Sequence, residues 1–439
     1  MNASEYKKYH ESFMQNNHGS TALHTYLCIF FTVQCAIYSA LTKRSSDSLQ
    51  CFNEYIVIVL PLILAHTILS KHIFLLNVII AVMLLVKLKS VNKDNIIKKF
   101  KLANSFDTKY ISSISILRAL TYLITVCCIL AVDFRAFPRH LAKTENFGYS
   151  LMDTGVGLFV LMSGLVHKDL SNFSFIRILQ SNVKFVCVLV TLGVSRFVMV
   201  RQLDYHEHVT EYGVHWNFFF TLAVCKVLST LFLSVTSHSL YLSMVVMALH
   251  ELLLFYGLQD WVFSDVARTN LLTANREGIS SSLGYVALYI FAVHVKQILS
   301  NKSLIRYQVL LKLALLSSFL FILMYLYDYF SVTSRTLANV GYCIYLAETL
   351  VSILFVMYSI EVLCNSKDKN YTFDIPDILI AVNKNGLIYF LIANLLTGLI
   401  NLSMRTMLLS STNAIIILNC YMILTILIVV SLKNRGIKL

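Results

Sequence analysis

The feature that most constrains this chain is a series of apolar stretches, each long enough to cross a bilayer as a helix. A helical crossing needs about 17–25 predominantly apolar residues, whereas a barrel strand needs about ten alternating ones. The stretches here are continuous and rich in aromatic residues, so they predict helices. We predict thirteen spans, near residues 20–42, 54–70, 73–87, 111–132, 151–166, 182–200, 216–238, 239–257, 279–299, 307–328, 338–363, 385–404 and 413–432.

The scarcity of charge supports the same interpretation. Of the 439 residues, 57% are hydrophobic and 13% are charged, which is about half the charged fraction of a soluble protein. A net charge of +13 would suit nucleic-acid binding, but the surplus lies in short loops between the apolar stretches. We therefore expect an all-α polytopic membrane protein, with residues 1–439 forming one bundle and a single membrane domain.

The loop lysines and arginines predict an orientation. Of the 36 Lys and Arg residues, 21 fall on the side of the membrane that also carries the C-terminus. Positive residues favour cytosolic loops, so we expect a cytosolic C-terminus and, with an odd number of spans, a luminal N-terminus. Three luminal segments then carry most of the chemically varied side chains.

The first luminal segment spans residues 131–145. Asp133 ends an apolar stretch and is followed by Arg139 and Lys143. One interpretation is an interfacial girdle in which Asp133 pairs with Arg139. The other is an acid–base pair, in which Asp133 accepts a proton and Lys143 stabilises developing negative charge. Asp153, just below the same face, belongs to the same candidate site, and Arg139 is a candidate ligand of phosphate.

The second luminal segment, 205–217, is rich in histidine and carboxylate. These groups suit zinc or iron, but their spacing is not His-Glu-x-x-His and no cysteine is near. We favour a hydrogen-bonding surface for a polyhydroxylated, phosphorylated head group and expect no metal; a solvated loop that caps the next span is a third alternative. The candidate substrate-binding residues are His206, His208, Glu211, His215, Trp216 and Asn217.

The third luminal segment precedes the span predicted at 279–299. Asn275 or Thr273 can cap that helix, with Glu277 in its first turn, and this structural role would be sufficient to explain the segment. Arg276, beside the helix N-terminus, could in addition hold a phosphate. The two roles are compatible, so Asn275 and Arg276 are both candidates for substrate binding.

Four stretches of the sequence carry a family resemblance: AVDFRAFPRHLAKTENFGYSLMDTGVGLFV (131–160), YHEHVTEYGVHWNFF (205–219), TANREGISSSLGY (273–285) and ANLLTGLINLSM (393–404). They are similar to the corresponding stretches of the GPI inositol acyltransferases of the endoplasmic reticulum, the family of the GPI-anchored wall transfer protein of yeasts. The resemblance extends over nearly the whole chain in span layout, while 87–109 and 300–335 match only in character. The chain resembles a compact fungal member with shorter loops.

The resemblance implies a reaction. A fatty acyl group, typically palmitoyl, passes from acyl-CoA to an inositol hydroxyl of glucosaminyl-phosphatidylinositol in GPI-anchor biosynthesis. The catalytic pair of the family is an Asp at a span mouth and a Lys ten residues later, which implies Asp133 and Lys143 here. Acyl-CoA is then a donor substrate, no cofactor stays bound, and the partners are the two substrates and membrane lipids. The implied location is the endoplasmic reticulum membrane.

Two other function classes remain open on the residues alone. A lipid transporter or scramblase would use the ionisable residues inside the spans, among them Glu251, Lys226 and Glu348. A metal-dependent membrane enzyme would be centred on His206, His208 and His215. The transporter predicts Gly or Pro breaks in paired spans, a pattern that is weak here because Pro occurs only at 61, 138 and 376.

Overall fold

The computed structural model describes residues 5–6, 9, 12–13, 15–42, 47–91, 100–101, 112–168, 175–202, 209–364 and 373–437. Within these residues every regular element is a helix, apart from isolated bridges between Tyr149 and residues 19 and 20. The elements are α2 (Ala22–Ala40), α3 (Asp47–Glu54), η1 (Tyr55–Val59), α4 (Leu60–Ala65), η2 (Ser70–His72), α5 (Ile73–Val91), α7 (Ser112–Ala131), η4 (Arg139–Leu141), α8 (Thr154–Leu165), α9 (Phe175–Gln202), α10 (Val209–Tyr212), α11 (Phe218–Val235), α12 (Ser239–Leu253), η5 (Leu254–Leu258), α13 (Gln259–Val262), α14 (Leu271–Ala274), α15 (Arg276–Ser300), α16 (Arg306–Phe330), α17 (Val340–Cys364), α18 (Asp377–Lys384), α19 (Gly386–Ser403), η6 (Thr406–Leu408) and α20 (Ser411–Asn434).

The expected all-helical membrane architecture is confirmed. Among the described residues, ten helices are long and apolar enough to cross a membrane. The three other predicted spans are also helical: Leu49–Ala65 and Thr154–Leu165 are shorter apolar helices, and α9 has 28 residues. The count of thirteen crossings therefore stays a prediction.

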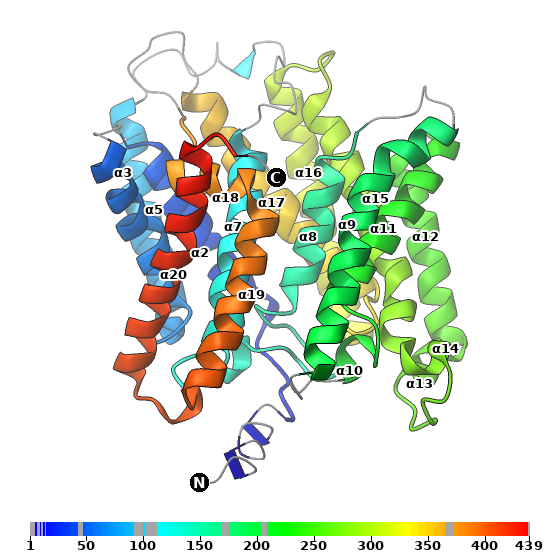
Figure 1. Ribbon diagram of the computed structural model, residues 1–439. Coiled ribbons are helices and arrows are strands. Elements are labelled where there is room, and N and C mark those ends of the chain that lie inside the picture. Colours follow the sequence, from blue (N-terminus) through cyan, green and yellow to red (C-terminus); the bar gives the residue numbers. More distant parts are fainter. Residues whose placement is uncertain are drawn as a thin grey trace.

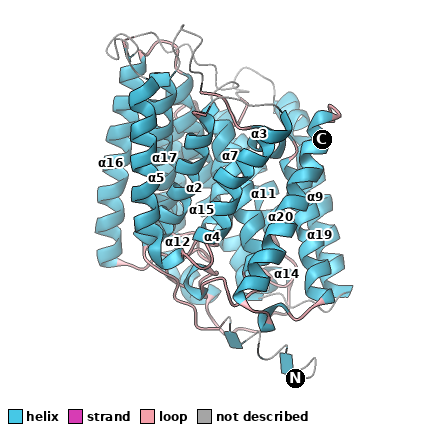
Figure 2. Cartoon of the chain, turned by 90° about the vertical axis from the view of Figure 1, so that its left-hand side faces the viewer, coloured by secondary structure: helices cyan, strands magenta, loops and turns pink. Residues whose placement is uncertain are grey.

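The two ends of the bundle carry different elements. In Figures 1 and 2 the amino terminus lies at the end that carries α14, and the C-terminal end of α20 lies toward the opposite end. Figure 1 also shows α10 and α13 at this end. We call this end, which carries residues 132–153, 209–217, 263–278 and 331–339, the site end. That it faces the lumen remains a prediction.

Helix α15 forms the centre of the bundle. In the most apolar 18-residue stretch of α15, 83% of the residues are buried, whereas in that of α16, at the periphery, 22% are buried. It packs on α8, α11, α12 and α17, and small residues allow close approach: a Cβ on Gly164 of α8 would lie 2.5 Å from the carbonyl oxygen of Tyr289. Its buried serines, such as Ser281 and Ser282, donate to carbonyls of the preceding turn, so they pack without unsatisfied hydroxyls.

Polar side chains inside the spans connect helices. Glu251 of α12 accepts hydrogen bonds from the Val340 N–H (3.1 Å) and the Tyr327 hydroxyl (3.2 Å), which caps the start of α17. Lys226 of α11 donates to the Tyr289 hydroxyl of α15 at 2.9 Å. A buried ionisable group in a bilayer is costly unless it is paired, and these bonds give both residues a structural role.

Candidate functional site

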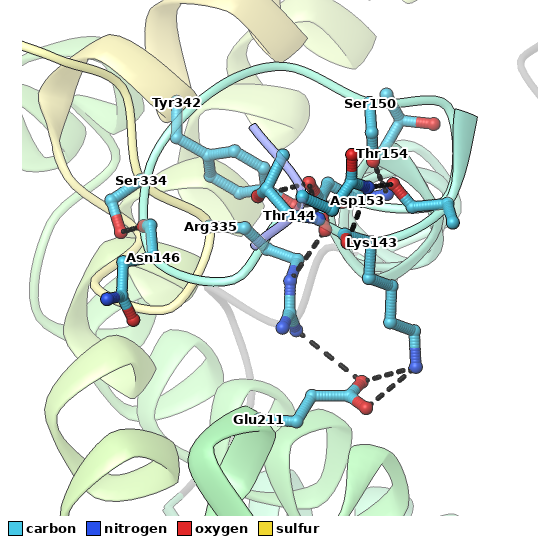
Figure 3. Close-up of polar contacts among 12 residues, drawn as sticks. Lys143, Thr144, Asn146, Ser150, Asp153, Thr154, Glu211, Ser334, Arg335 and Tyr342 are labelled. Carbon is cyan, nitrogen blue, oxygen red and sulfur yellow. Dashed lines mark hydrogen bonds and ion pairs between the residues drawn. The ribbon is translucent and has the colours of Figure 1, made fainter. Parts of the chain in front are cut away.

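Lys143 and Glu211 form an ion pair at the site end. The Nζ atom of Lys143 lies 2.7 Å from both carboxylate oxygens of Glu211, and their side chains are 41% and 18% exposed (Figure 3). Lys143 comes from the loop after α7, whereas Glu211 lies on α10. The structure therefore joins two of the predicted luminal segments through these residues.

Arg335 extends this pair into a network. Its Nε lies 2.9 Å from Oδ1 of Asp153, and its Nη1 lies 3.5 Å from Oε1 of Glu211 (Figure 3). The Arg335 side chain is only 5% exposed. Its loop between α16 and α17 is held from α12, because His250 Nε2 lies 2.9 Å from the Leu337 carbonyl oxygen. A buried guanidinium thus links a third segment of the site end to the first two.

Asp153 closes the loop that carries Lys143. Its Oδ2 accepts hydrogen bonds from the backbone N–H and the hydroxyl of Thr144, at 3.1 and 2.7 Å. The Tyr342 hydroxyl donates to the backbone carbonyl of Asp153 at 2.8 Å, and the Asp153 N–H donates to Ser150 Oγ at 3.2 Å (Figure 3). The Asp153 carboxylate therefore binds both Thr144 and Arg335, and so connects the loop of Lys143 to the loop of Arg335.

The charges of this network reinforce one another. Burial by itself would raise the pKa of Glu211, but the positive charges of Lys143 and Arg335 lower it from 4.5 to about 2. Burial likewise opposes the charge of Arg335, yet Glu211 and Asp153 raise the pKa of Arg335 above its ordinary value. Glu211 and Arg335 are therefore both charged at neutral pH.

Asp133 has a different partner from Lys143. It lies two residues beyond the last residue of α7 and is 5% exposed. Its Oδ2 accepts a hydrogen bond of 2.7 Å from Nδ2 of Asn401, in the last turn of α19. The two members of the predicted catalytic pair thus lie in separately organised surroundings at the same end of the bundle.

Asn17 fastens the amino-terminal segment to the loop of Lys143. Its Nδ2 lies within hydrogen-bonding distance of the carbonyl oxygens of Arg139 (3.0 Å), Ala142 (2.9 Å) and Lys143 (2.9 Å), and its side chain is buried. The backbone N–H of Glu145 donates in return to the Asn17 carbonyl at 3.1 Å. One side chain therefore fixes the turn that lies between Asp133 and Lys143 in the sequence.

Comparison with known proteins identifies the family. The GWT1 family model matches residues 6–432. The chain belongs to the GWT1 family. It is 31% identical to GPI-anchored wall transfer protein 1 of Schizosaccharomyces pombe, over 99% of both chains. It is also 31% identical to glucosaminyl-phosphatidylinositol-acyltransferase PIGW of Homo sapiens, over 96% of this chain and 97% of the relative, and to PIGW of Bos taurus, over 98% and 99%.

The resemblance read from the four sequence stretches is confirmed by this membership. The match also includes the regions 87–109 and 300–335, because they lie inside the matched residues. Mammalian relatives match as fully as the yeast one, so the attribution to a fungus stays a prediction.

In this GWT1-family chain, Asn275 and Asn217 have structural partners. Asn275 Oδ1 accepts the backbone N–H groups of His215 and Trp216 at 2.8 and 2.9 Å, while its Nδ2 donates to the Leu271 carbonyl. Asn217 caps α11 and donates to the Gly193 carbonyl at 2.9 Å. Both amides are almost fully buried, and their role in substrate binding stays a prediction.

The neighbouring candidates Arg276, Trp216 and His215 also contact other residues of the site end. Arg276 is 5% exposed and donates to the carbonyl oxygens of Ser264 and Val266, and so fastens the loop before α14. Trp216 Nε1 donates to the Thr221 hydroxyl at 2.9 Å. The His215 ring lies 5.3 Å from that of Phe197, with a buried Nδ1 that has no hydrogen-bond partner in the described part of the chain.

The three remaining candidates are Arg139, His206 and His208. Arg139 keeps two guanidinium nitrogens, Nε and Nη2, buried without a hydrogen-bond partner among the described residues. His206 and His208 lie outside the residues that the structure describes. Among the described residues no group of three or more His, Cys, Asp or Glu side chains is arranged to hold a metal ion.

The sequence interpretation missed Arg335 and Asn17. Arg335 is the only arginine in the short polar loop 331–339, which is a signal that could have been noticed. Asn17 stands in a polar segment with no motif. Asn401 belongs to one of the family stretches, but its bond to Asp133 was not predicted.

Proposed function

We propose that this chain is the inositol acyltransferase of GPI-anchor biosynthesis, acting in the endoplasmic reticulum membrane. It would transfer a fatty acyl group from acyl-CoA to an inositol hydroxyl of glucosaminyl-phosphatidylinositol. The observation that carries the proposal is the nearly full-length similarity to relatives named glucosaminyl-phosphatidylinositol-acyltransferase. The donor, the location and the roles of individual residues are inferred from chemistry and from the family resemblance.

The reaction needs a base, an oxyanion partner and the exclusion of water. Asp133 removes the proton of the inositol hydroxyl while the hydroxyl oxygen attacks the carbonyl carbon of the thioester. Lys143 stabilises the tetrahedral oxyanion. The carbon–sulfur bond then breaks, the ester forms, and the leaving CoA thiolate takes up the proton that Asp133 removed, which restores the base. Burial of Asp133 at 5% exposure supports this role, because water that would hydrolyse the donor is excluded there.

The state of Lys143 fits its proposed role. The side chain is 41% exposed, so a substrate can reach its ammonium group, and Glu211 keeps it in place before the substrate arrives. Arg139 is the candidate for a phosphate of either substrate, because two of its buried nitrogens lack a partner among the described residues. His215, Trp216, Asn217, Asn275 and Arg276 would then shape the surrounding wall.

The test is a reconstituted assay with purified protein, palmitoyl-CoA and glucosaminyl-phosphatidylinositol, omitting each substrate in turn. We expect acyl transfer that needs both substrates. Asp133→Asn and Lys143→Ala should each lower the rate at least about a hundredfold, because a positioned base and an oxyanion donor each contribute on the order of 10²–10³. A matched control exists, because Lys433 and Asp377 form a 2.7 Å ion pair near the opposite end. Lys433→Ala and Asp377→Asn should retain the wild-type rate.

Absence of acyl transfer by the wild-type protein would overturn the proposed function, and two further outcomes would overturn its mechanism. Wild-type rates in both site variants would show that Asp133 and Lys143 do not take part in the reaction. Complete loss of activity after dialysis against a chelator, restored by zinc, would instead support the metal-dependent alternative centred on His206, His208 and His215. We expect activity to persist in the chelator, because the proposed reaction uses acyl-CoA as a substrate and no bound cofactor.

A further inference from the structure

Asp133 is oriented by a helix that lies far away in the sequence. Asp133 is 5% exposed, and its Oδ2 accepts a 2.7 Å hydrogen bond from Asn401, which is 268 residues further along the chain. A buried carboxylate requires hydrogen-bond donors, and a side-chain amide fixes the direction of the oxygen to which it donates. The bond therefore joins the end of α7 to the last turn of α19 through the proposed base itself.

The Asn401 donor to Asp133 is a neutral amide. Asp153 is ion-paired with Arg335, and Glu211 with Lys143 and Arg335. The amide N–H of Asn401 orients one oxygen of the Asp133 carboxylate without adding a charge of its own, and a fixed orientation is what proton transfer to that carboxylate requires.

The rest of the Asn401 amide is not explained by the stability of the bundle. Its Oδ1 is buried and has no hydrogen-bond partner in the part of the chain that the structure describes. Burying such an oxygen costs free energy, and an apolar side chain would avoid that cost in a membrane helix. The orientation of the amide is set by its partner, because turning it over would place an oxygen against the carboxylate.

We propose that Asn401 is a positioning residue for proton transfer from the inositol hydroxyl to Asp133. This inference rests on the proposed function. Asn401 holds the Asp133 carboxylate in the direction in which it meets the hydroxyl, and it neither gains nor loses a proton during the reaction. Its removal should therefore slow the chemical step and leave the binding of the glycolipid unchanged.

The chain supplies a matched control on the same helix. Asn394 lies two turns earlier on α19, and its Nδ2 donates to the Phe390 carbonyl of the preceding turn at 2.7 Å. In the reconstituted assay, Asn401→Ala should lower kcat about 10-fold to 100-fold, since hydrogen bonds to charged groups have effects of this size. Its KM for glucosaminyl-phosphatidylinositol should stay within about twofold, as expected for an interaction needed only in the chemical step. Asn394→Ala should change neither constant by more than about twofold.

A pH profile separates positioning from a loss of packing. In Asn401→Asp two carboxylates adjoin and share one proton, so activity should acquire a new decline at alkaline pH where both ionise. Tyr421 of α20, a titratable residue whose hydroxyl donates to the Val126 and Ala393 carbonyls, is unchanged in both variants. Asn394→Asp should follow the wild-type profile.

The outcomes distinguish a failure of the proposed function from a failure of the role of Asn401. If wild-type protein does not acylate the glycolipid, the proposed function fails. If the wild type is active and Asn401→Ala has the same kcat, or if Asn401→Asp reproduces the wild-type pH profile, the role of Asn401 is wrong and the proposed function stands. Thermal unfolding in detergent identifies any variant that is merely unfolded.

Discussion

Asp133 and Lys143 share one end of the bundle but are held in opposite ways. Asp133 is almost fully buried and receives a bond from a neutral amide on a distant helix. Lys143 is 41% exposed and belongs to a charged network with Glu211, Arg335 and Asp153. The first arrangement orients a carboxylate through an amide, and the second holds an ammonium group within an ion-paired network.

This difference has a consequence for substitution. The Lys143 surroundings depend on the balance of two acids and two cations, so removing one charge leaves another uncompensated. The Asp133 surroundings depend on orientation, so a substitution there should affect rate more than folding. Substitutions in the charged network and in the loop between the two groups test this difference.

Arg335→Ala should have the largest effect. It leaves Asp153 and Glu211 without their shared buried cation, and breaking such a pair costs about 3–5 kcal/mol. Thermal unfolding in detergent should show a large loss of stability. Arg268, which is 22% exposed and paired with Glu277, is the control, and Arg268→Ala should lower the unfolding temperature much less. Equal effects of both variants would contradict the central role of Arg335.

Asn17→Asp should have the next largest effect on stability. The variant keeps an acceptor for the Gly19 N–H but places a carboxylate oxygen against the carbonyls of Arg139, Ala142 and Lys143. The loss of a shared donor and the new repulsion should cost about 1–3 kcal/mol and release the loop. Hydrogen exchange of residues 139–149 measures this directly. Unchanged protection there would show that the amino-terminal segment does not hold the loop.

Thr144→Val should have an effect no larger than that of Asn17→Asp. It removes the hydroxyl that donates to the charged Asp153 Oδ2 and should cost about 1.5–3 kcal/mol at most, since the backbone N–H bond to the same oxygen remains. The control is Thr154→Val, which removes a bond to the neutral Leu151 carbonyl and should cost about 0.5–1.5 kcal/mol. Denaturation midpoints of the two variants compare a charged with a neutral acceptor.

Glu211→Gln should have the smallest effect on stability at neutral pH, and its difference from the wild type should shrink in acid. The pKa of Glu211 is lowered in the folded state from 4.5 to about 2, so its ionised form stabilises the fold above about pH 4.5. That contribution is lost as the pH falls from 4.5 toward 2. Because Lys143 is 41% exposed, solvent screens the pair and the contribution is modest. Unfolding temperatures measured from about pH 7 to about pH 3 should fall less steeply in Glu211→Gln than in the wild type.

The sequence alone predicted the class of fold and the segments that carry the site. Long apolar stretches can only satisfy their backbone groups in a membrane as helices, so each predicted span is helical in the structure. The segments with Asp133, Lys143 and Glu211 were also found from the sequence, because charge is scarce in this chain and its clusters stand out. Family membership followed from the same stretches.

The partners of these residues were decided only by the tertiary structure. Asn17 reaches a loop 122 residues away, Arg335 meets Asp153 and Glu211, and Asn401 meets Asp133. Helical periodicity determines which face of a helix is apolar, but the choice of neighbouring helix and their relative height depends on the packing of the entire bundle. A single sequence therefore indicates which groups can do chemistry, while helix packing decides which groups hold them in place.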